Sequence, residues 1–370
     1  MAPVLHLAPP AMRTTFAVVV AIVVVVGTAL SLVRARAWWV RVWDFPRVQL
    51  AVLAAVALAL GAGRWREWPW AALAVLLVAS LVFQLLLVWR YTPLAPREVQ
   101  RSEQAGDGRR IALLMSNVLQ TNRRADLLLA AIRDADPDIV LCVETDDWWR
   151  EQLDALAETH PHAVRRPLPN TYGMLLYSRL PLEEVQAEAL VEPDIPSIQA
   201  RVRLRDGARV WLNCVHPRPP APGESDDSLP RDAELLLVGE RVREASEPVI
   251  VCGDLNDVAW SRTTRLFQKV SRLVDPRKGR GLYSTFHARV PFFRWPLDHV
   301  FHSDSFRLVA LRRLGYVGSD HFPVFVALSH EPAAAAEQEA PEETTEDLQE
   351  AAETVAEGEE KTANGTKRAS

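Results

Sequence analysis

Residues 248–257 read Pro-Val-Ile-Val-Cys-Gly-Asp-Leu-Asn-Asp, a short apolar run followed by Gly253, Asp254 and Asn256. The run contains β-branched residues and is too short for a helix of its own, so it predicts a buried strand. Gly253 allows the backbone to turn closely where the strand ends. Asp254 and Asn256 are two positions apart and therefore point the same way. The stretch predicts two oxygen-bearing side chains at one place, although a solvated turn has the same local sequence.

Polar residues follow other predicted strands in the same way. Strand ends are where open α/β sheets place their sites, so we expect these side chains to converge. The set is rich in oxygen and contains no Cys, which fits Mg²⁺ or Mn²⁺ better than zinc. Its members are Asn117, Glu144, His216, Asp254, Asn256, Asp298, His299, Asp320 and His321.

Composition divides the 370 residues into unequal parts, so the net charge of −5 describes none of them. Residues 1–100 are strongly apolar with Arg as almost the only charge, and residues 331–360 are rich in Glu and Ala without Lys or Arg. The segment between them is long enough to bury a sizeable core. We predict a membrane region at 1–92, a linker at 93–109, a globular domain at 110–330 and a disordered acidic tail at 331–370.

Three apolar stretches, 14–33, 46–62 and 69–90, predict three transmembrane helices. The alternatives are a cleaved signal peptide for the first stretch and a buried soluble hairpin for the others. Tryptophans gather at the ends of the stretches, as they do at membrane interfaces. Arginines are more numerous in the first loop and after the third stretch than on the opposite side. This asymmetry predicts an integral membrane protein whose globular domain faces the cytoplasm.

The globular segment alternates apolar strands with amphipathic stretches, which predicts a mixed α/β domain. Helices are expected at 125–132, ended by Asp136-Pro137, and at 231–244, with a surface loop at 217–230. Cys142, Cys214 and Cys252 lie in predicted strands and read as buried free thiols. The predicted strands are Ile111–Met115, Ile139–Val143, Met174–Tyr177, Val210–Val215, Val249–Cys252, Val300–Phe301 and Val324–Leu328.

From about Arg110 to Leu328 the sequence resembles the endonuclease/exonuclease/phosphatase superfamily, which has the deoxyribonuclease-I-like fold. The blocks that carry the resemblance occur in the order typical of that superfamily: Asn117, Val143-Glu144, His216, Gly253 to Asn256, Leu297 to Phe301, and Gly318 to Pro323. The resemblance implies a four-layered α/β sandwich, two mixed β-sheets flanked by helices, here preceded by transmembrane helices. It suggests a membrane-tethered, bacterial-type member with a catalytic domain at 110–330.

The resemblance also implies roles for individual residues. Glu144 resembles the main metal-binding carboxylate, helped by Asn117 and Asp320. Asp254 and Asn256 resemble the pair that orients the attacking water and the phosphate. His321 resembles the catalytic imidazole with Asp298 as its carboxylate partner, and His216 a second imidazole that acts as general acid or contacts phosphate. Phosphoester cleavage needs such a set of water, base and positive charge.

Two positions depart from the family pattern. Many members have Gln where this chain has Val143, so a hydrogen bond to the metal carboxylate is lost. The abasic-site branch has Tyr where His216 stands, which disfavours that DNA-repair activity.

Two classes of function remain open. One is a metal-dependent phosphoesterase that cleaves nucleic acid or a phosphorylated lipid or small molecule, and the other is a catalytically degenerate, membrane-tethered binding module. An Arg-rich run favours nucleic acid, unless it is a solvated helix face: Arg262, Arg265, Lys269, Arg272, Arg277, Lys278 and Arg280. A lipid substrate is favoured by the predicted attachment to the lipid bilayer and by the apolar loop Val290 to Trp295 beside Asp298. The alternative for that loop is a packed turn.

Overall fold

The computed structural model describes residues 10–103 and 106–369 and forms two compact units that divide between Arg90 and Tyr91. The first unit is helical. Its helices are α1 (Pro10–Leu32), α2 (Trp38–Arg41), α3 (Arg47–Leu60) and α4 (Trp68–Val88), and the 3-10 turns Val42–Asp44, Ala62–Arg64 and Trp89–Tyr91 accompany them.

Two helices of the first unit are long and apolar enough to span a membrane, over Met12–Leu32 and Trp68–Tyr91. The predicted second span differs from the prediction: α3 has 14 residues and is bent by 71° from the Trp38–Asp44 segment before it. At about 1.5 Å per residue such a helix is roughly 21 Å long, shorter than a hydrocarbon core. A third span exists only if the bent pair counts as one.

Polar side chains meet inside the first unit where α3 begins. Arg47 donates to Ser31 Oγ at 2.8 Å and to Gln84 Oε1 at 3.1 Å, and it pairs with Asp44 at the bend. Gln84 in turn donates to Thr28 Oγ1 at 2.9 Å. These contacts connect α1, α3 and α4, and they explain why the apolar helix starts at Arg47, since its charge has a partner only at that end.

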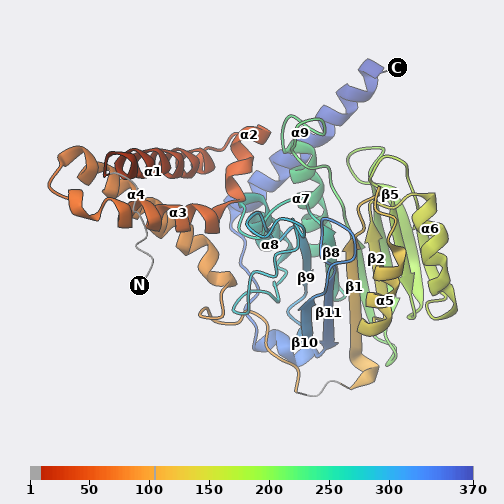
Figure 1. Cartoon of the computed structure of the whole chain (residues 1–370). Coiled ribbons are helices and arrows are strands. Elements are labelled where there is room, and N and C mark those ends of the chain that lie inside the picture. The colour runs from red at the N-terminus through yellow and green to blue at the C-terminus, as the bar shows by residue number, and fades with distance from the viewer. Residues whose placement is uncertain (1–9, 104–105, 370) are drawn as a thin grey trace. The chain divides into compact units, whose positions relative to one another are not determined.

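The second unit contains two mixed sheets within the described residues (Figure 1). The six-stranded sheet has the order β10-β11-β1-β2-β4-β3, and the five-stranded sheet has the order β5-β6-β7-β8-β9. Strands of the first sheet are β1 (Arg110–Asn117), β2 (Ile139–Val143), β3 (His162–Arg166), β4 (Met174–Ser178), β10 (Phe306–Arg313) and β11 (Val324–His330). Strands of the second are β5 (Leu182–Ala189), β6 (Pro196–Arg203), β7 (Arg209–Cys214), β8 (Val249–Asp254) and β9 (Asp298–His302).

The sheets pack face to face and helices cover their outer faces, so the predicted four-layered sandwich is confirmed (Figure 1). The central layer joins residues of both sheets, such as Leu113, Leu141 and Ile250. The first sheet is covered by α5 (Ala125–Ala135) and α6 (Asp147–Leu153). The second is covered by α7 (Leu229–Arg243), α8 (Arg262–Ser271) and α9 (Thr345–Ala369). Strands buried on both faces have unbroken apolar sequences, which is why β2 and β8 are readable from sequence.

Strands on the periphery escaped sequence analysis. The sequence of β5, Leu-Glu-Glu-Val-Gln-Ala-Glu-Ala, contains no buried residue, and β3 and the far half of β10 are similar. Edge strands carry polar side chains on both faces and therefore lose the alternation that marks a strand. The two predicted helices are present as α5 and α7, and Asp136 with a φ of 51° ends α5 as expected.

The prediction of a disordered tail at 331–370 is wrong for most of its length. Residues 332–336 form a 3-10 turn, and 345–369 form helix α9, which packs on α7 and α8 through buried Ala351 and Val355. The sequence shows no apolar stripe in this segment, because the buried positions of α9 are one Ala, one Thr, one Val and one Gly. Ion pairs between acidic side chains of the tail and basic side chains of α8, including Lys269 with Asp347 at 2.9 Å, also hold the helix in place.

The prediction of a linker at 93–109 also needs correction. Tyr91 and Val99 are buried in the second unit, and the Glu98 carboxylate accepts hydrogen bonds from Lys278 Nζ at 2.8 Å and from the Asp275 amide at 2.7 Å. Ser102 N donates to Leu308 O at 3.0 Å. The second unit therefore begins at Tyr91, directly after the apolar helix, and residues 104–105 lie outside the described residues.

Candidate functional site

Four strand ends form one edge of the sandwich, which we call the site rim. β1 and β2 are parallel neighbours in one sheet, and β7 and β8 are parallel neighbours in the other. β1 and β8 end in Asn117 and Asp254, and Glu144 and His216 come just after β2 and β7, because each strand leaves the apolar core at its carboxyl end. Asp298 reaches the same rim from the start of antiparallel β9, where it lies opposite Asp254 in register. The fold thus brings together residues that are up to about 200 positions apart.

Asn117 connects the two sheets at the site rim. Its Nδ2 donates to Glu144 Oε1 at 2.6 Å and to Asp254 Oδ2 at 3.0 Å. Its Oδ1 accepts from the Leu119 amide at 3.0 Å, which fixes the orientation of the side chain. Burial raises the pKa of Glu144 to about 7, although the hydrogen bond from Asn117 opposes this effect. Burial also raises the pKa of Asp254. The rim therefore holds desolvated carboxyl groups that positive charge would stabilise.

His321 and Asp298 form a direct pair. His321 Nδ1 lies 2.7 Å from Asp298 Oδ2, and its Nε2 lies 3.5 Å from Asp254 Oδ2. Burial alone would lower the pKa of His321, but the carboxylates of Asp298 and Asp254 raise it to about 10. The ring is therefore held protonated, with Nδ1–H donated to Asp298 and Nε2–H directed into the site.

Asn256 and His216 complete the rim beside Asp254. Asn256 has a φ of 50°, its amide donates to Asp254 Oδ1 at 2.9 Å, and its Nδ2 donates to Pro217 O at 3.0 Å. His216 is buried, with Nε2 4.0 Å from Asp254 Oδ2, and its Nδ1 has no hydrogen-bond partner among the described residues. Burial lowers the pKa of His216 to about 4, so this second imidazole is neutral in the free protein.

Two sets of residues at the rim have ligand atoms suited to a cation. Asp254, Asp298 and His321 offer ligand atoms within 4.8 Å of one another. His321 would have to release a proton to join this set, and its raised pKa disfavours that release in the metal-free protein. The predicted set is Glu144 and Asn117 with Asp320, whose charge acts on Glu144. Its donors are oxygens, and among the described residues no cationic side chain is hydrogen-bonded to the half-buried Glu144 carboxyl, so these residues fit a hard cation such as Mg²⁺.

Sequence analysis missed the residues that hold the rim in place. Ser319 Oγ donates to Asn117 O at 2.8 Å and accepts from the His321 amide at 3.0 Å, so it connects the end of β1 to the segment that carries His321. Thr285 Oγ1 accepts from the Asp298 amide at 3.3 Å. Ser319 stands inside the Gly-Ser-Asp-His block and its position was a usable signal. Thr285 has no signal in the sequence, because only the folded β8–β9 connection brings it to Asp298.

A second buried network lies directly behind Asp298, and we call it the Arg277 network. Arg277 is paired with Asp275 at 2.7 Å, its Nη2 lies 2.7 Å from His299 Nδ1, and its Nη1 donates to Asp298 O at 3.4 Å. His299 Nε2 donates to Asp257 O at 2.8 Å. Burial, with Arg277 nearby, lowers the pKa of His299 to about 3. His299 is thus a neutral structural side chain, and it faces away from the site.

The Arg-rich run does not form an open basic groove. Arg262, Lys269 and Arg272 pair with Glu350, Asp347 and Glu343, which belong to α9 or to the segment before it. Arg277 and Lys278 are buried in the pairs described above, and Arg280 donates to Val99 O. The feature that favoured nucleic acid is therefore largely neutralised by the chain itself.

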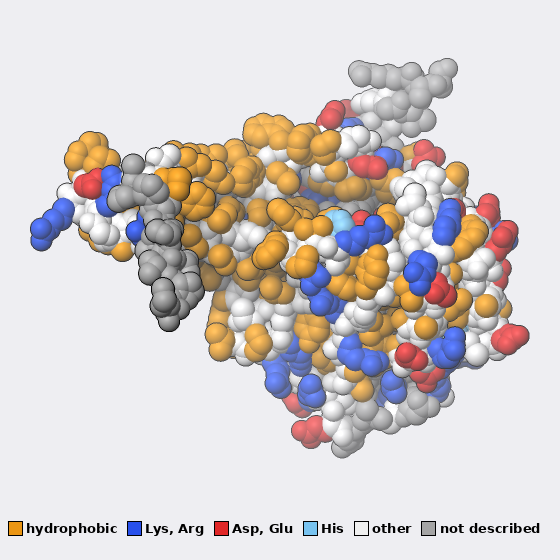
Figure 2. Space-filling model, viewed as in Figure 1, with side chains coloured by type: hydrophobic (Ala, Val, Ile, Leu, Met, Phe, Trp, Pro, Cys, Tyr) orange, Lys and Arg blue, Asp and Glu red, His pale blue; other side chains and the backbone are white. Residues whose placement is uncertain are grey.

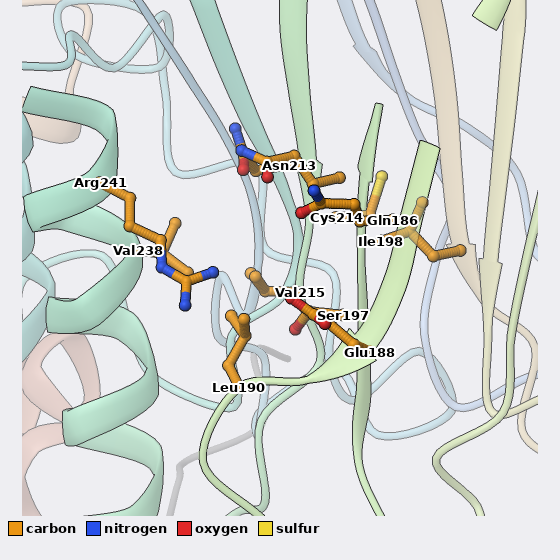
Figure 3. Close-up of a pocket in the computed structure, with 11 residues that line it drawn as sticks. Gln186, Glu188, Leu190, Ser197, Ile198, Asn213, Cys214, Val215, Val238 and Arg241 are labelled. Carbon is orange, nitrogen blue, oxygen red and sulfur yellow. The ribbon is translucent and has the colours of Figure 1, made fainter. Parts of the chain in front are cut away.

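A small pocket also lies between α7 and strands β5 to β7 (Figure 3). Val238 and Arg241 enter it from the helix, and Ser197 and Asn213 from the strands. None of the candidate catalytic residues lines it. The chemistry suggested by the sequence therefore belongs to the site rim and not to this pocket.

Solved structures with a similar fold come from several organisms. D. rerio TDP2 complexed with single strand DNA product is 16% identical, with a TM-score of 0.48, and covers 60% of this chain and 99% of its own. The human Nocturnin catalytic domain with bound sulfate anion is 18% identical, with a TM-score of 0.49, and covers 64% of this chain and 96% of its own. The endonuclease/exonuclease/phosphatase from Beutenbergia cavernae is also 18% identical, with a TM-score of 0.49, covering 60% of this chain and 72% of its own.

No curated protein sequence matches this chain. The model of the Endonuclease/Exonuclease/phosphatase family matches residues 113–321, a span that runs from β1 to His321 and includes every candidate site residue. Because this span is more than half of the chain, the protein belongs to the endonuclease/exonuclease/phosphatase family.

Proposed function

We propose that this protein is a membrane-anchored, Mg²⁺- or Mn²⁺-dependent phosphoesterase that hydrolyses phosphodiester or phosphomonoester bonds. The observation that carries the proposal is the convergence of Glu144, Asp254 and the Asp298–His321 pair at one rim, with Asn117 bonded to both Glu144 and Asp254. Members of this family hydrolyse phosphoester bonds. A degenerate binding module would not need this set of buried acids, since burying them costs stability.

Glu144, with Asn117 and Asp320, would hold the divalent cation. When bound, such a cation polarises a phosphoryl oxygen and stabilises the charge that develops on it. The raised pKa of the half-buried Glu144 carboxyl favours this role, because a cation compensates the cost of ionising it next to Asp254 and Asp320.

The protein's own groups orient the reactants. Asp254 accepts hydrogen bonds from Asn117 and from the Asn256 amide, which holds its carboxylate at the centre of the rim for a water molecule. His321, positioned by Asp298, directs Nε2–H toward that centre and stabilises negative charge on a phosphoryl oxygen. His216 is neutral and offers one ring nitrogen to the phosphate or leaving group.

The metal requirement is tested with full-length protein in detergent and a generic phosphodiester such as bis(4-nitrophenyl) phosphate. Hydrolysis should require Mg²⁺ or Mn²⁺, and Glu144→Gln should reduce it to background, because the amide cannot supply the anionic ligand. Glu151→Gln, a change at an exposed carboxylate on α6, is the matched control and should keep activity. Full activity of the Glu144 variant in the presence of chelator would disprove the metal assignment, and no activity of the wild type would favour a binding module.

We also propose that the second unit faces the cytoplasm, on the basis of the arginine asymmetry around the apolar helices. A reporter that is active only in the cytoplasm, joined after Ser370, should work. Activity only of a reporter that requires export would reverse the orientation.

A further inference from the structure

An exposed apolar run lies beside the site rim. Residues 290–293, Val-Pro-Phe-Phe, are all exposed; Phe292 is 83% and Phe293 56% accessible. Four consecutive exposed apolar residues are rare on soluble surfaces, because each costs free energy in water. We call residues 286–295 the aromatic loop. The predicted alternative, a packed turn, does not describe it, since both phenylalanine side chains at its tip are exposed to solvent.

The aromatic loop is built as a rigid turn rather than a loose strand. His287 N donates to Phe293 O at 2.8 Å, and Phe286 N donates to Trp295 O at 3.0 Å. Its base meets the site itself: Ala288 N donates to Asp320 O at 2.6 Å, and the Phe286 and His321 rings lie 5.0 Å apart. A surface that holds the loop therefore also holds the site rim.

Arginines lie in the aromatic loop and beside its base. Arg289 and Arg313 are exposed and Arg294 is half-buried. Arg289 donates to Gly318 O at 2.6 Å, and Arg313 donates to Ser284 O at 2.9 Å, just before the loop begins. Within the part of the chain that the structure describes, none of the three forms an ion pair with a carboxylate, in contrast to Arg262 and Lys269 of α8. Figure 2 shows one face of the molecule, on which Lys and Arg side chains lie next to hydrophobic ones. The patch is suited to a partner that is apolar and anionic.

The connection between β8 and β9 carries both this loop and the attachment to the apolar helix. Tyr91 is the last residue of the candidate span Trp68–Tyr91, and its hydroxyl donates to Ala259 O at 2.8 Å. Ala259 is three residues from Asn256, hence at most about 11 Å away. Tyr91 is therefore fixed within the second unit, close to the segment that carries Asn256.

From these observations we infer that the aromatic loop, with Arg289, Arg294 and Arg313, docks onto an anionic phospholipid bilayer and presents the site rim to a phosphoester held in that bilayer. This inference rests on the proposed function and specifies its substrate class. Phenylalanines would enter the interfacial region, and arginines would bind lipid phosphates. Nucleic acid also attracts arginine and aromatic rings, but it does not account for a tether at the end of an apolar helix.

Docking is tested by site-directed labelling of the full-length chain in proteoliposomes that contain phosphatidylglycerol. The native cysteines are all buried, so Phe292→Cys introduces one accessible thiol for an environment-sensitive fluorophore. Its matched control is Val185→Cys. Val185 is 43% exposed and lies on β5, at the edge of the five-stranded sheet opposite β9, the strand that follows the aromatic loop. We expect brominated lipid to quench the label at 292 and aqueous iodide to quench the label at 185. Equal iodide quenching at both positions overturns the inference, and Phe293→Cys repeats the measurement at a second position.

Charge and substrate class are tested with the same labelled proteins. Vesicles of phosphatidylcholine alone, or the change Arg289→Glu with Arg313→Glu, should weaken lipid quenching at 292 severalfold. If a single-stranded oligonucleotide shields the label in detergent and anionic vesicles do not, the surface binds nucleic acid and the inference is overturned. Phe292→Ser with Phe293→Ser should lower hydrolysis of bilayer phosphoester about tenfold or more, because two aromatic side chains that enter the bilayer contribute strongly to its binding. The wild type's hydrolysis of soluble ester tests the proposed function separately, so either idea can fail alone.

Discussion

The site rim and the Arg277 network each contain a buried histidine that follows an aspartate, yet the two imidazoles have opposite electrostatic environments. His321 follows Asp320 and binds Asp298, and the two nearby carboxylates raise its pKa to about 10 despite burial. His299 follows Asp298 and binds Arg277, and burial beside that cation lowers its pKa to about 3. The same dipeptide therefore carries a protonated imidazole in one place and a neutral one in the other, and the charge of the neighbouring side chain decides which.

The largest expected effect separates the two histidines by activity. His321→Ala should lower turnover on the order of a thousandfold or more, because it removes positive charge and a proton donor at the reacting centre. His299→Gln should lower turnover less than about tenfold, because Gln can accept from Arg277 and donate to Asp257 O. Steady-state hydrolysis of a soluble phosphodiester by the full-length protein measures both, with thermal unfolding as the control for folding. Comparable losses in the two variants would contradict the division of roles.

The next effect tests whether Asp298 and His321 act as one unit. Asp298→Ala should lose somewhat less turnover than His321→Ala, and the double variant should be little worse than His321→Ala alone, since either change disables the same group. The ratio of turnover in a double-mutant cycle measures this coupling. Multiplying losses, with each protein folded, would show that the residues work independently.

A smaller effect concerns stability against pH and the depressed pKa of His299. Above pH 6.5 the imidazole is neutral in both the folded and the unfolded protein. As the pH falls toward 3, the imidazole binds a proton in the unfolded chain but not in the folded one. Stability is therefore present above the unfolded pKa and lost on acidification, at up to about 1.4 kcal/mol per pH unit for one proton. His299→Gln should flatten this share of the slope in unfolding midpoints between pH 6 and pH 4. An unchanged slope would mean that His299 does not stay neutral.

The smallest effect probes the segment that attaches the Arg277 network to the apolar helix. Tyr91→Phe removes the hydrogen bond from the Tyr91 hydroxyl to Ala259 O and leaves that carbonyl without its donor. We expect a loss of about 1 kcal/mol in stability, with unchanged turnover. The thermal midpoint of the full-length protein measures it. An identical midpoint would indicate that residues 91–99 do behave as a free linker.

The sequence reveals those candidate site residues that follow directly after a strand, because the strands themselves can be predicted. Asn117, Glu144, His216, Asp254 and Asn256 each follow a buried apolar run, and parallel strands end at a common edge, so their convergence at the site rim follows from order along the chain. The pairing of His321 with Asp298 rather than with its neighbour Asp320 was also predicted, through the resemblance of the blocks. Thr285 and the Arg277 network were not, because they come from the β8–β9 connection, which has no periodic pattern.

The sequence by itself determined the class of fold, the two buried sheets, the edge at which the polar residues meet, and the apolar helices, because burial imposes periodic and unbroken apolar patterns that a single chain displays. The tertiary structure alone decided what charged segments do. The acidic tail became α9 because α8 presents Arg262 and Lys269 to it. The supposed linker became part of the domain because Asp275 and Lys278 bind Glu98. The charge of each buried histidine was likewise settled by partners distant in sequence, since electrostatic energy depends on distance in space and not on order along the chain.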